Sequence, residues 1–119
     1  MTAVAIAPEW VPVCEYADLT PERGVAALID GDQVALFRLA DGSLRAVGNR
    51  DPFSGTYVLA RGIVGSRGPS PTVASPMLKH VFDLDSGRSV EDATVRLPIY
   101  RVRVVEGTVQ VGAPLPNEW

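Results

Sequence analysis

Three pairs of an acidic residue and a glycine divide the chain into short apolar runs: Asp30-Gly31, Asp41-Gly42 and Glu106-Gly107. Glycine tolerates the positive φ that tight hairpin turns require, so each pair predicts the tip of a β-hairpin. Seventeen valines among 119 residues, with 11 glycines and 10 prolines, favour many short strands and turns over helices. We therefore expect an all-β fold of small antiparallel sheets.

The strand pattern is clearest near the C-terminus. Residues 100–104 alternate apolar side chains with Arg101 and Arg103, which should face solvent, and residues 108–111 repeat the alternation. A single helical turn is expected over residues 20–24, which supply a capping threonine, a proline and a glycine stop. Residues 48–80 are rich in glycine and proline and predict long loops. One domain is expected over residues 10–112, with tails at 1–9 and 113–119.

Charge and residue counts exclude several classes of function. The net charge is −3 and no basic run is present, which disfavours nucleic-acid binding. The apolar stretches are far shorter than the roughly 20 residues of a membrane span. The N-terminus lacks a basic region before its short apolar run, and Cys14 is the sole cysteine, so we expect a cytoplasmic protein. One cysteine and one histidine, His80, allow neither a disulfide nor a Cys/His metal site within the chain.

Two loop motifs resemble the cluster-binding loops of Rieske iron–sulfur proteins. Residues 49–55 read Asn-Arg-Asp-Pro-Phe-Ser-Gly, which is similar to Asn-x-Cys-Pro-His-x-Gly. Residues 75–87 read Ser-Pro-Met-Leu-Lys-His-Val-Phe-Asp-Leu-Asp-Ser-Gly, which is similar to Cys-Pro-x-His-Gly-x-x-Phe-Asp-x-x-x-Gly. The resemblance covers residues 10–112 and implies a Rieske-like domain in which loops 49–56 and 75–82 meet at one end.

The ligands of the Rieske cluster are missing from these motifs. Carried over by position, the two thiolate ligands fall on Asp51 and Ser75, and the two imidazole ligands fall on Phe53 and Leu78. His80 lies two positions past the expected ligand. Two oxygen side chains do not hold a [2Fe-2S] cluster, so the resemblance implies a degenerate cluster site, with no metal, cofactor or catalytic residue in this chain.

One family combines these features, and the chain resembles it in residues 49–53, 61–65 and 75–79: the small subunit of assimilatory NADH-dependent nitrite reductase. The resemblance implies a large-subunit partner that carries FAD, a [4Fe-4S] cluster and sirohaem and reduces nitrite to ammonia. The small subunit would then be a non-catalytic accessory. The alternative is a free-standing, cluster-free Rieske-like binding module for another partner protein.

Two interpretations of the loop tips stay open. Phe53 and Leu78 could fill the space that a cluster would occupy, since an unfilled cavity would be destabilising. Alternatively, the tips could form a docking surface for the large subunit, made of Arg50, Phe53, Met77, Leu78, Lys79 and His80. Basic residues at 50, 61, 67, 79 and 88 are either an ordinary solvated surface or a patch that steers the chain onto an acidic partner.

Catalysis by the loops is disfavoured. His80 could act as a general base with Ser75 and either Asp51 or Asp83 nearby, but no nucleophile motif surrounds the serine. Cys14 follows an apolar run and has no basic neighbour, which is typical of a small buried hydrophobic residue rather than a nucleophile.

Overall fold

A computed structural model of the chain describes residues 10–77 and 80–116, and its strands form two antiparallel sheets. The larger sheet has six strands in the order β1-β9-β8-β4-β3-β2, and the smaller has three in the order β5-β6-β7. The strands are β1 (Trp10–Glu15), β2 (Gly24–Ile29), β3 (Asp32–Arg38), β4 (Leu44–Gly48), β5 (Ile63–Arg67), β6 (Ser70–Ala74), β7 (Val81–Asp83), β8 (Ile99–Val105) and β9 (Thr108–Pro114). Two short 3₁₀ helices, η1 (Tyr16–Asp18) and η2 (Leu59–Arg61), complete the described elements. The all-β prediction is confirmed.

The acidic-glycine pairs form the predicted hairpin tips. Asp30 and Gly31 have φ of 51° and 88° and join β2 to β3, while Glu106 and Gly107 have φ of 50° and 82° and join β8 to β9. Positive φ at both central residues matches the twist of the flanking strands, which is why this turn closes two-residue hairpins. Between β3 and β4 only Gly42 of the pair has positive φ, at 90°.

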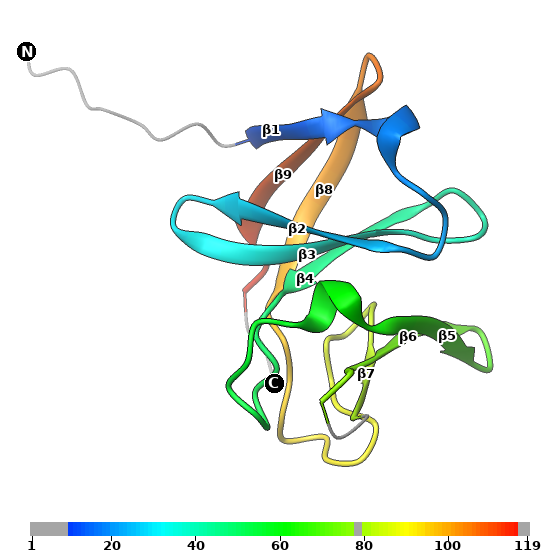
Figure 1. Cartoon of the computed structure of the whole chain (residues 1–119), viewed down its shortest axis with the longest axis vertical. Coiled ribbons are helices and arrows are strands. Elements are labelled where there is room, and N and C mark those ends of the chain that lie inside the picture. Colours follow the sequence, from blue (N-terminus) through cyan, green and yellow to red (C-terminus); the bar gives the residue numbers. More distant parts are fainter. Residues whose placement is uncertain (1–9, 78–79, 117–119) are drawn as a thin grey trace, which may run out of the picture.

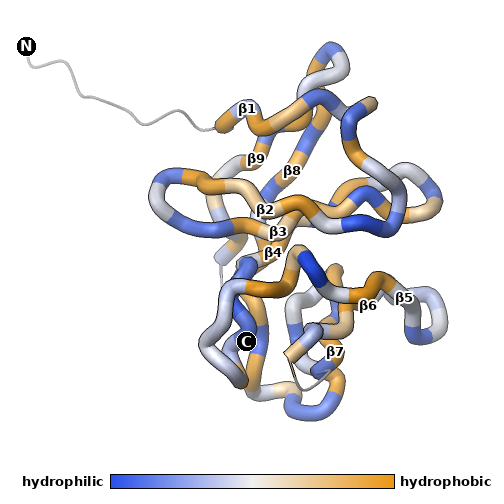
Figure 2. The backbone as a smooth tube through the Cα atoms, in the orientation of Figure 1, coloured by the Kyte–Doolittle hydropathy of each residue, from blue (hydrophilic) through white to orange (hydrophobic). Residues whose placement is uncertain are grey.

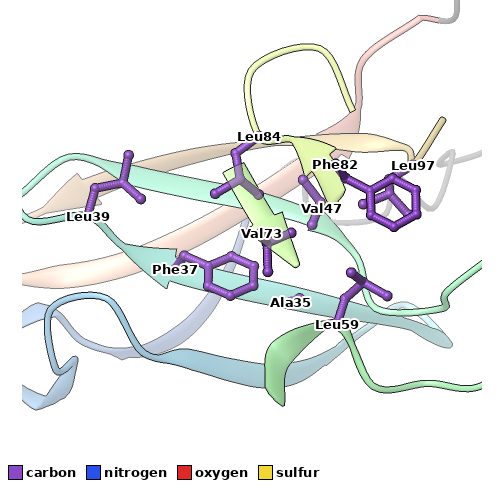
Figure 3. Packing of buried hydrophobic residues seen from close by; sticks show 9 residues of the cluster. All are labelled: Ala35, Phe37, Leu39, Val47, Leu59, Val73, Phe82, Leu84 and Leu97. Carbon is purple, nitrogen blue, oxygen red and sulfur yellow. The ribbon is translucent and has the colours of Figure 1, made fainter. Parts of the chain in front are cut away.

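Strand β3 lies between two apolar clusters because both of its faces are buried. Val34 and Leu36 face one cluster, and Ala35 and Phe37 face the other. The first cluster is formed by strands of the larger sheet together with Leu19, which follows η1, and it also includes Ile29, Ala46, Tyr100, Val109 and Val111. Figure 3 shows the second, where side chains of β3 and β4 meet those of η2 and the smaller sheet: Leu39, Val47, Leu59, Val73, Phe82, Leu84 and Leu97.

The smaller sheet lies in the segment that the sequence predicts as long loops. Strands β5 and β6 pair from Ile63↔Ala74 to Arg67↔Ser70, and Figure 1 shows this sheet below the larger one. Gly65 in β5 and Pro71 in β6 interrupt the apolar alternation, so the sequence pattern did not predict these two strands. Val64 and Val73 are paired across the two strands and pack in or against the shared core. In Figure 2 hydrophobic positions of β5 and β6 appear orange, next to hydrophilic positions in blue.

One local expectation differs from the structure. The helical turn expected over residues 20–24 is wrong: Glu22 has a φ of 65° and its N–H donates to the Arg38 carbonyl at 2.6 Å, which ties this segment to β3 instead. Strand β9 ends at Pro114, which pairs with Tyr100 of β8. Arg101 and Arg103 are exposed, as predicted. The expected tail 1–9 lies outside the described residues.

Candidate functional site

Asn49 anchors the first loop to the sheets. Its side chain is buried, and its Oδ1 accepts a 2.8 Å hydrogen bond from the N–H of Ala60 while its Nδ2 donates to Gln33 Oε1 at 3.1 Å. The backbone of Asn49 also bonds both Gln33 and Leu59. A buried amide whose donor and acceptor are both satisfied fixes the direction in which the loop leaves β4.

The two loops are joined by a hydrogen bond between Asp51 and Ser75. Asp51 is 0% exposed and Ser75 is 1% exposed. The Ser75 hydroxyl donates to Asp51 Oδ2 at 2.6 Å, and the N–H of Phe53 donates to Asp51 Oδ1 at 2.8 Å. The prediction that the loops meet is confirmed, and they meet at the two positions where the Rieske pattern has cysteines. A hydrogen bond to a buried carboxylate is among the stronger kind.

The second loop closes on itself around Ser75. The Ser75 Oγ accepts the N–H of Met77 at 3.1 Å, and the Ser75 N–H donates to the His80 carbonyl at 2.8 Å. The serine therefore bonds within its own loop and to Asp51 of the other. Leu78 and Lys79, which the sequence assigns to a cluster position and to docking, lie outside the described residues.

Phe53 forms an aromatic stack at the outer end of this site. Its ring lies 3.9 Å from the His80 ring, centroid to centroid, with 21° between the planes, and 6.0 Å from the buried ring of Phe82. Phe53 is nevertheless 36% exposed. One part of the side chain thus covers the core at Phe82 and another part faces outward. Phe53 therefore has features both of a residue that fills the cluster space and of a residue on a docking surface.

We use the name tip for four exposed residues of the two loops, Arg50, Phe53, Tyr57 and Met77, together with the half-buried His80. Arg50 is exposed and forms an isolated bridge with Tyr57, which is itself exposed. Met77 is 40% exposed. Neither Tyr57 nor the stacking of Phe53 on His80 was predicted from the sequence. An aromatic residue in a polar loop is only a weak signal for Tyr57. No nearby residue in the sequence indicates that Phe53 stacks on His80.

The polar groups of the site are not arranged as a Ser-His-Asp triad. The Ser75 hydroxyl donates to Asp51, whereas the His80 Nδ1 lies 3.6 Å from Glu91 Oε1. A nucleophilic serine needs the histidine as the acceptor of its proton. Cys14 is not a nucleophile candidate either. Burial, and then the charges of Asp18 and Glu15, raise the pKa of its thiol, which disfavours the reactive thiolate.

The residues at the described cluster positions do not fit a [2Fe-2S] cluster. Such a cluster needs thiolate or imidazole ligands, whereas Asp51 and Ser75 supply oxygens already bonded to each other and Phe53 supplies only carbon atoms. Within residues 10–77 and 80–116, no group of three or more His, Cys, Asp or Glu side chains is placed to hold a metal ion. In the same residues, no helix is long and apolar enough to cross a membrane.

Comparison with known proteins supports the resemblance of the two loops to Rieske proteins. A family model of the Rieske-like [2Fe-2S] domain matches residues 9–112. The NADH nitrite reductase small subunit of Escherichia coli K12 is 38% identical over 104 residues, which cover 87% of this chain and 96% of that protein. A solved structure from Mycobacterium tuberculosis, assigned as an NADH-dependent nitrite reductase small subunit, is 54% identical with a TM-score of 0.85, covering 87% of this chain and 94% of that one.

A third relative is a much longer protein. The NAD(P)H nitrite reductase large subunit of Klebsiella oxytoca is 33% identical over 103 residues, which are 87% of this chain but 11% of that protein. A domain of this kind therefore also occurs within a large subunit. The matched family, the identities and the shared fold lead to one assignment. The chain belongs to the Rieske-like [2Fe-2S] domain family and, within it, to the small subunits of NADH-dependent nitrite reductase.

Proposed function

We propose that this chain is a non-catalytic small subunit that supports the reduction of nitrite to ammonia by a large subunit using NADH. The observation that carries the proposal is the hydrogen bond that the Ser75 hydroxyl donates to Asp51, because these two side chains stand at the two thiolate positions of a Rieske site. A hydrogen-bonded hydroxyl and carboxylate hold the loops together but cannot accept an electron. The redox centres implied by the resemblance, FAD, a [4Fe-4S] cluster and sirohaem, then belong to the large subunit.

The tip is the surface by which we propose that the chain docks on the large subunit. It combines an exposed aromatic ring, the flexible thioether of Met77 and the guanidinium of Arg50, which are residue types enriched at protein interfaces. The tip also rests on a rigid base, since Asn49, Asp51 and Ser75 are buried and hydrogen-bonded beneath it. A preorganised surface loses little conformational entropy on binding. In the Klebsiella relative a domain of this kind is part of a large subunit, which supports the choice of partner.

We propose that this assembly works in the cytoplasm. The chain carries one cysteine, Cys14, which has no partner for an intrachain disulfide. A lone thiol suits a reducing compartment.

Co-purification with the large subunit tests the proposal. We expect the tagged chain and the large subunit, expressed together, to elute as one complex that contains flavin and haem absorbance. The chain expressed alone should contain no stoichiometric iron or labile sulfide. Separate elution of the two proteins, or a [2Fe-2S] spectrum from the chain alone, would contradict the proposal.

A further inference from the structure

Strand β2 forms one edge of the larger sheet and has β3 as its neighbour. Ile29 and Asp32 flank the two-residue turn, so this pair exchanges hydrogen bonds, and the bonded residues then alternate along the ladder. The backbone groups of Val25 and Ala27 therefore also form hydrogen bonds to β3. The backbone groups of Gly24, Ala26 and Leu28 point outward, where a further strand would bond.

The other edge strands of the described structure are protected against pairing, and β2 is not. β1 contains Pro12 and a register shift between Pro12 and Cys14. β5 ends in a glycine, a serine and Arg67, and β7 spans three residues whose Val81 carbonyl accepts the N–H of Val90. Prolines, bulges, charges and short length are the usual ways in which proteins block edge pairing. β2 reads Gly-Val-Ala-Ala-Leu-Ile and has none of them.

The side chains of β2 are also exposed to an unusual degree for apolar residues. Leu28 is 69% exposed, Val25 is 38% exposed, and Ala26 is exposed. Figure 2 shows hydrophobic residues along most of this strand. An unprotected, apolar edge is either an aggregation site or a docking site for an added strand.

A groove continues the edge at the start of β2. It has a volume of about 590 Å³ and is lined by residues 22–24 at the start of β2 and by residues 60–64 of η2 and β5, which include Glu22, Arg23, Arg61 and Ile63. Figure 1 shows β2 running above η2 and β5, between which the groove lies. Ile63 is 77% exposed. The groove thus offers an apolar contact and two guanidiniums against the single carboxylate of Glu22, a net positive lining that favours an apolar segment that carries a carboxylate.

The opposite end of β2 adjoins the tip. Leu28 pairs with Gln33, and the Gln33 side chain accepts a hydrogen bond from Asn49, the first residue of the loop that carries Arg50 and Phe53. Paired residues share a face of the sheet, so Leu28, Gln33 and Asn49 lie in one row. A protein seated on the tip would therefore reach the end of β2 without crossing another element.

We propose that β2 is a second docking site, which takes an extended apolar segment of the large subunit as an added strand, with a carboxylate of that segment at Arg23 and Arg61. The proposal rests on the proposed function, because the partner is the one that binds the tip. A second copy of this chain fits less well. Symmetric pairing about Ala26, which uses all three outward residues, brings Glu22 of each copy toward Asp30 of the other, and like charges opposite each other destabilise a strand pair.

Binding of variants of the full chain to the large subunit tests this proposal by calorimetry. Ala26→Pro removes an outward N–H that β3 does not use, and Leu28→Lys places a charge on the edge. Each should weaken binding by about tenfold or more, and Arg61→Glu should weaken it by a similar factor. The control is Val104→Lys, which replaces a 44% exposed valine on β8 and should leave affinity within about twofold. Circular dichroism and thermal unfolding establish that each variant is folded.

The outcomes separate this proposal from the proposed function. If Phe53→Asp abolishes binding while Leu28→Lys and Ala26→Pro bind as wild type, the tip docks and the β2 proposal is wrong. If the wild-type chain does not bind the large subunit, the proposed function fails first. If the wild-type chain forms a concentration-dependent dimer and Leu28→Lys is a monomer, the edge of β2 binds a second copy of the chain. That result would contradict the proposal. If Ala26→Pro does not fold, Leu28→Lys and Arg61→Glu decide.

Discussion

The Ser75 hydroxyl donates a 2.6 Å hydrogen bond to the Asp51 carboxylate and thereby joins two loops that are 24 residues apart in the sequence. In the Rieske pattern these positions carry the two cysteines that share one iron. The chain keeps the meeting of the loops and replaces a metal-ligand bridge with a direct bond between side chains. This hydrogen bond joins the loops through their own side chains.

The first prediction concerns the strength of that bond. Ser75→Ala leaves one oxygen of a buried carboxylate without its donor, which should lower the free energy of unfolding by about 1.5 to 3 kcal/mol. Asp51→Asn should cost less, because the amide can accept from the N–H of Phe53 and donate to the Ser75 hydroxyl. Urea denaturation measures both. Equal stability of Ser75→Ala and the wild type would mean that the bond does not hold the loops.

The second prediction concerns a variant that carries the four ligands of a Rieske cluster. The variant Asp51→Cys, Phe53→His, Ser75→Cys and Leu78→His restores the four ligand types of a Rieske centre in their sequence positions. After reconstitution with iron and sulfide under reducing conditions, we expect a visible absorption spectrum and two irons per chain. The triple variant that retains Leu78 is the matched control and should hold less iron. A quadruple variant that folds but binds no iron would show that the loops have diverged beyond a change of ligands.

The third prediction concerns docking by the tip. Phe53→Asp places a charge on the exposed part of the ring site and should weaken binding to the large subunit by about 10- to 100-fold. Phe53→Leu retains apolar contact and should bind more tightly than Phe53→Asp. Both lose the stack on His80, so both should be destabilised by about 1 kcal/mol or more. A folded Phe53→Asp variant with wild-type affinity would contradict docking by Phe53 and would mean that this side chain only fills the space of the cluster.

The fourth prediction concerns the thiol of Cys14. Burial, followed by Asp18 and Glu15, raises its pKa, so its alkylation by iodoacetamide near pH 8 should be slower in the native chain than in urea. A folded-state pKa above the unfolded one favours folding while the pH is below the unfolded pKa. That contribution is lost as the pH rises through the folded pKa. Cys14→Ala should therefore flatten the decline of stability above about pH 8.5. Equal alkylation rates with and without urea would count against this assignment.

Local sequence rules predicted the parts of the fold that local geometry decides. Asp30-Gly31 and Glu106-Gly107 adopt positive φ at both residues, as in a turn whose twist matches that of the flanking strands. The strands β5 and β6 could not be predicted in this way. Gly65 and Pro71 break the alternation, and what stabilises the pair is the burial of Val64 and Val73 against the core that η2 and β3 complete. That contact exists only in the folded chain.

The site shows the same division. Its cluster positions and the meeting of its loops were implied by the resemblance of residues 49–55 and 75–87 to the two Rieske loop motifs. The bond between Asp51 and Ser75 and the stack of Phe53 on His80 depend on tertiary approach, and no residue near either pair in the sequence encodes it. Tyr57 joins the tip only because its backbone bridges to Arg50. Tertiary contacts of this kind are beyond pattern reasoning on one sequence.

The rate of nitrite reduction by NADH, measured with purified large subunit in the presence and absence of this chain, tests the accessory role most directly. We predict that added wild-type chain raises the rate or the lifetime of the activity to a plateau at one chain per large subunit. Phe53→Asp should not do so at the same concentration, whereas Val104→Lys should match the wild type. An equal rate and lifetime with and without the chain would contradict the account.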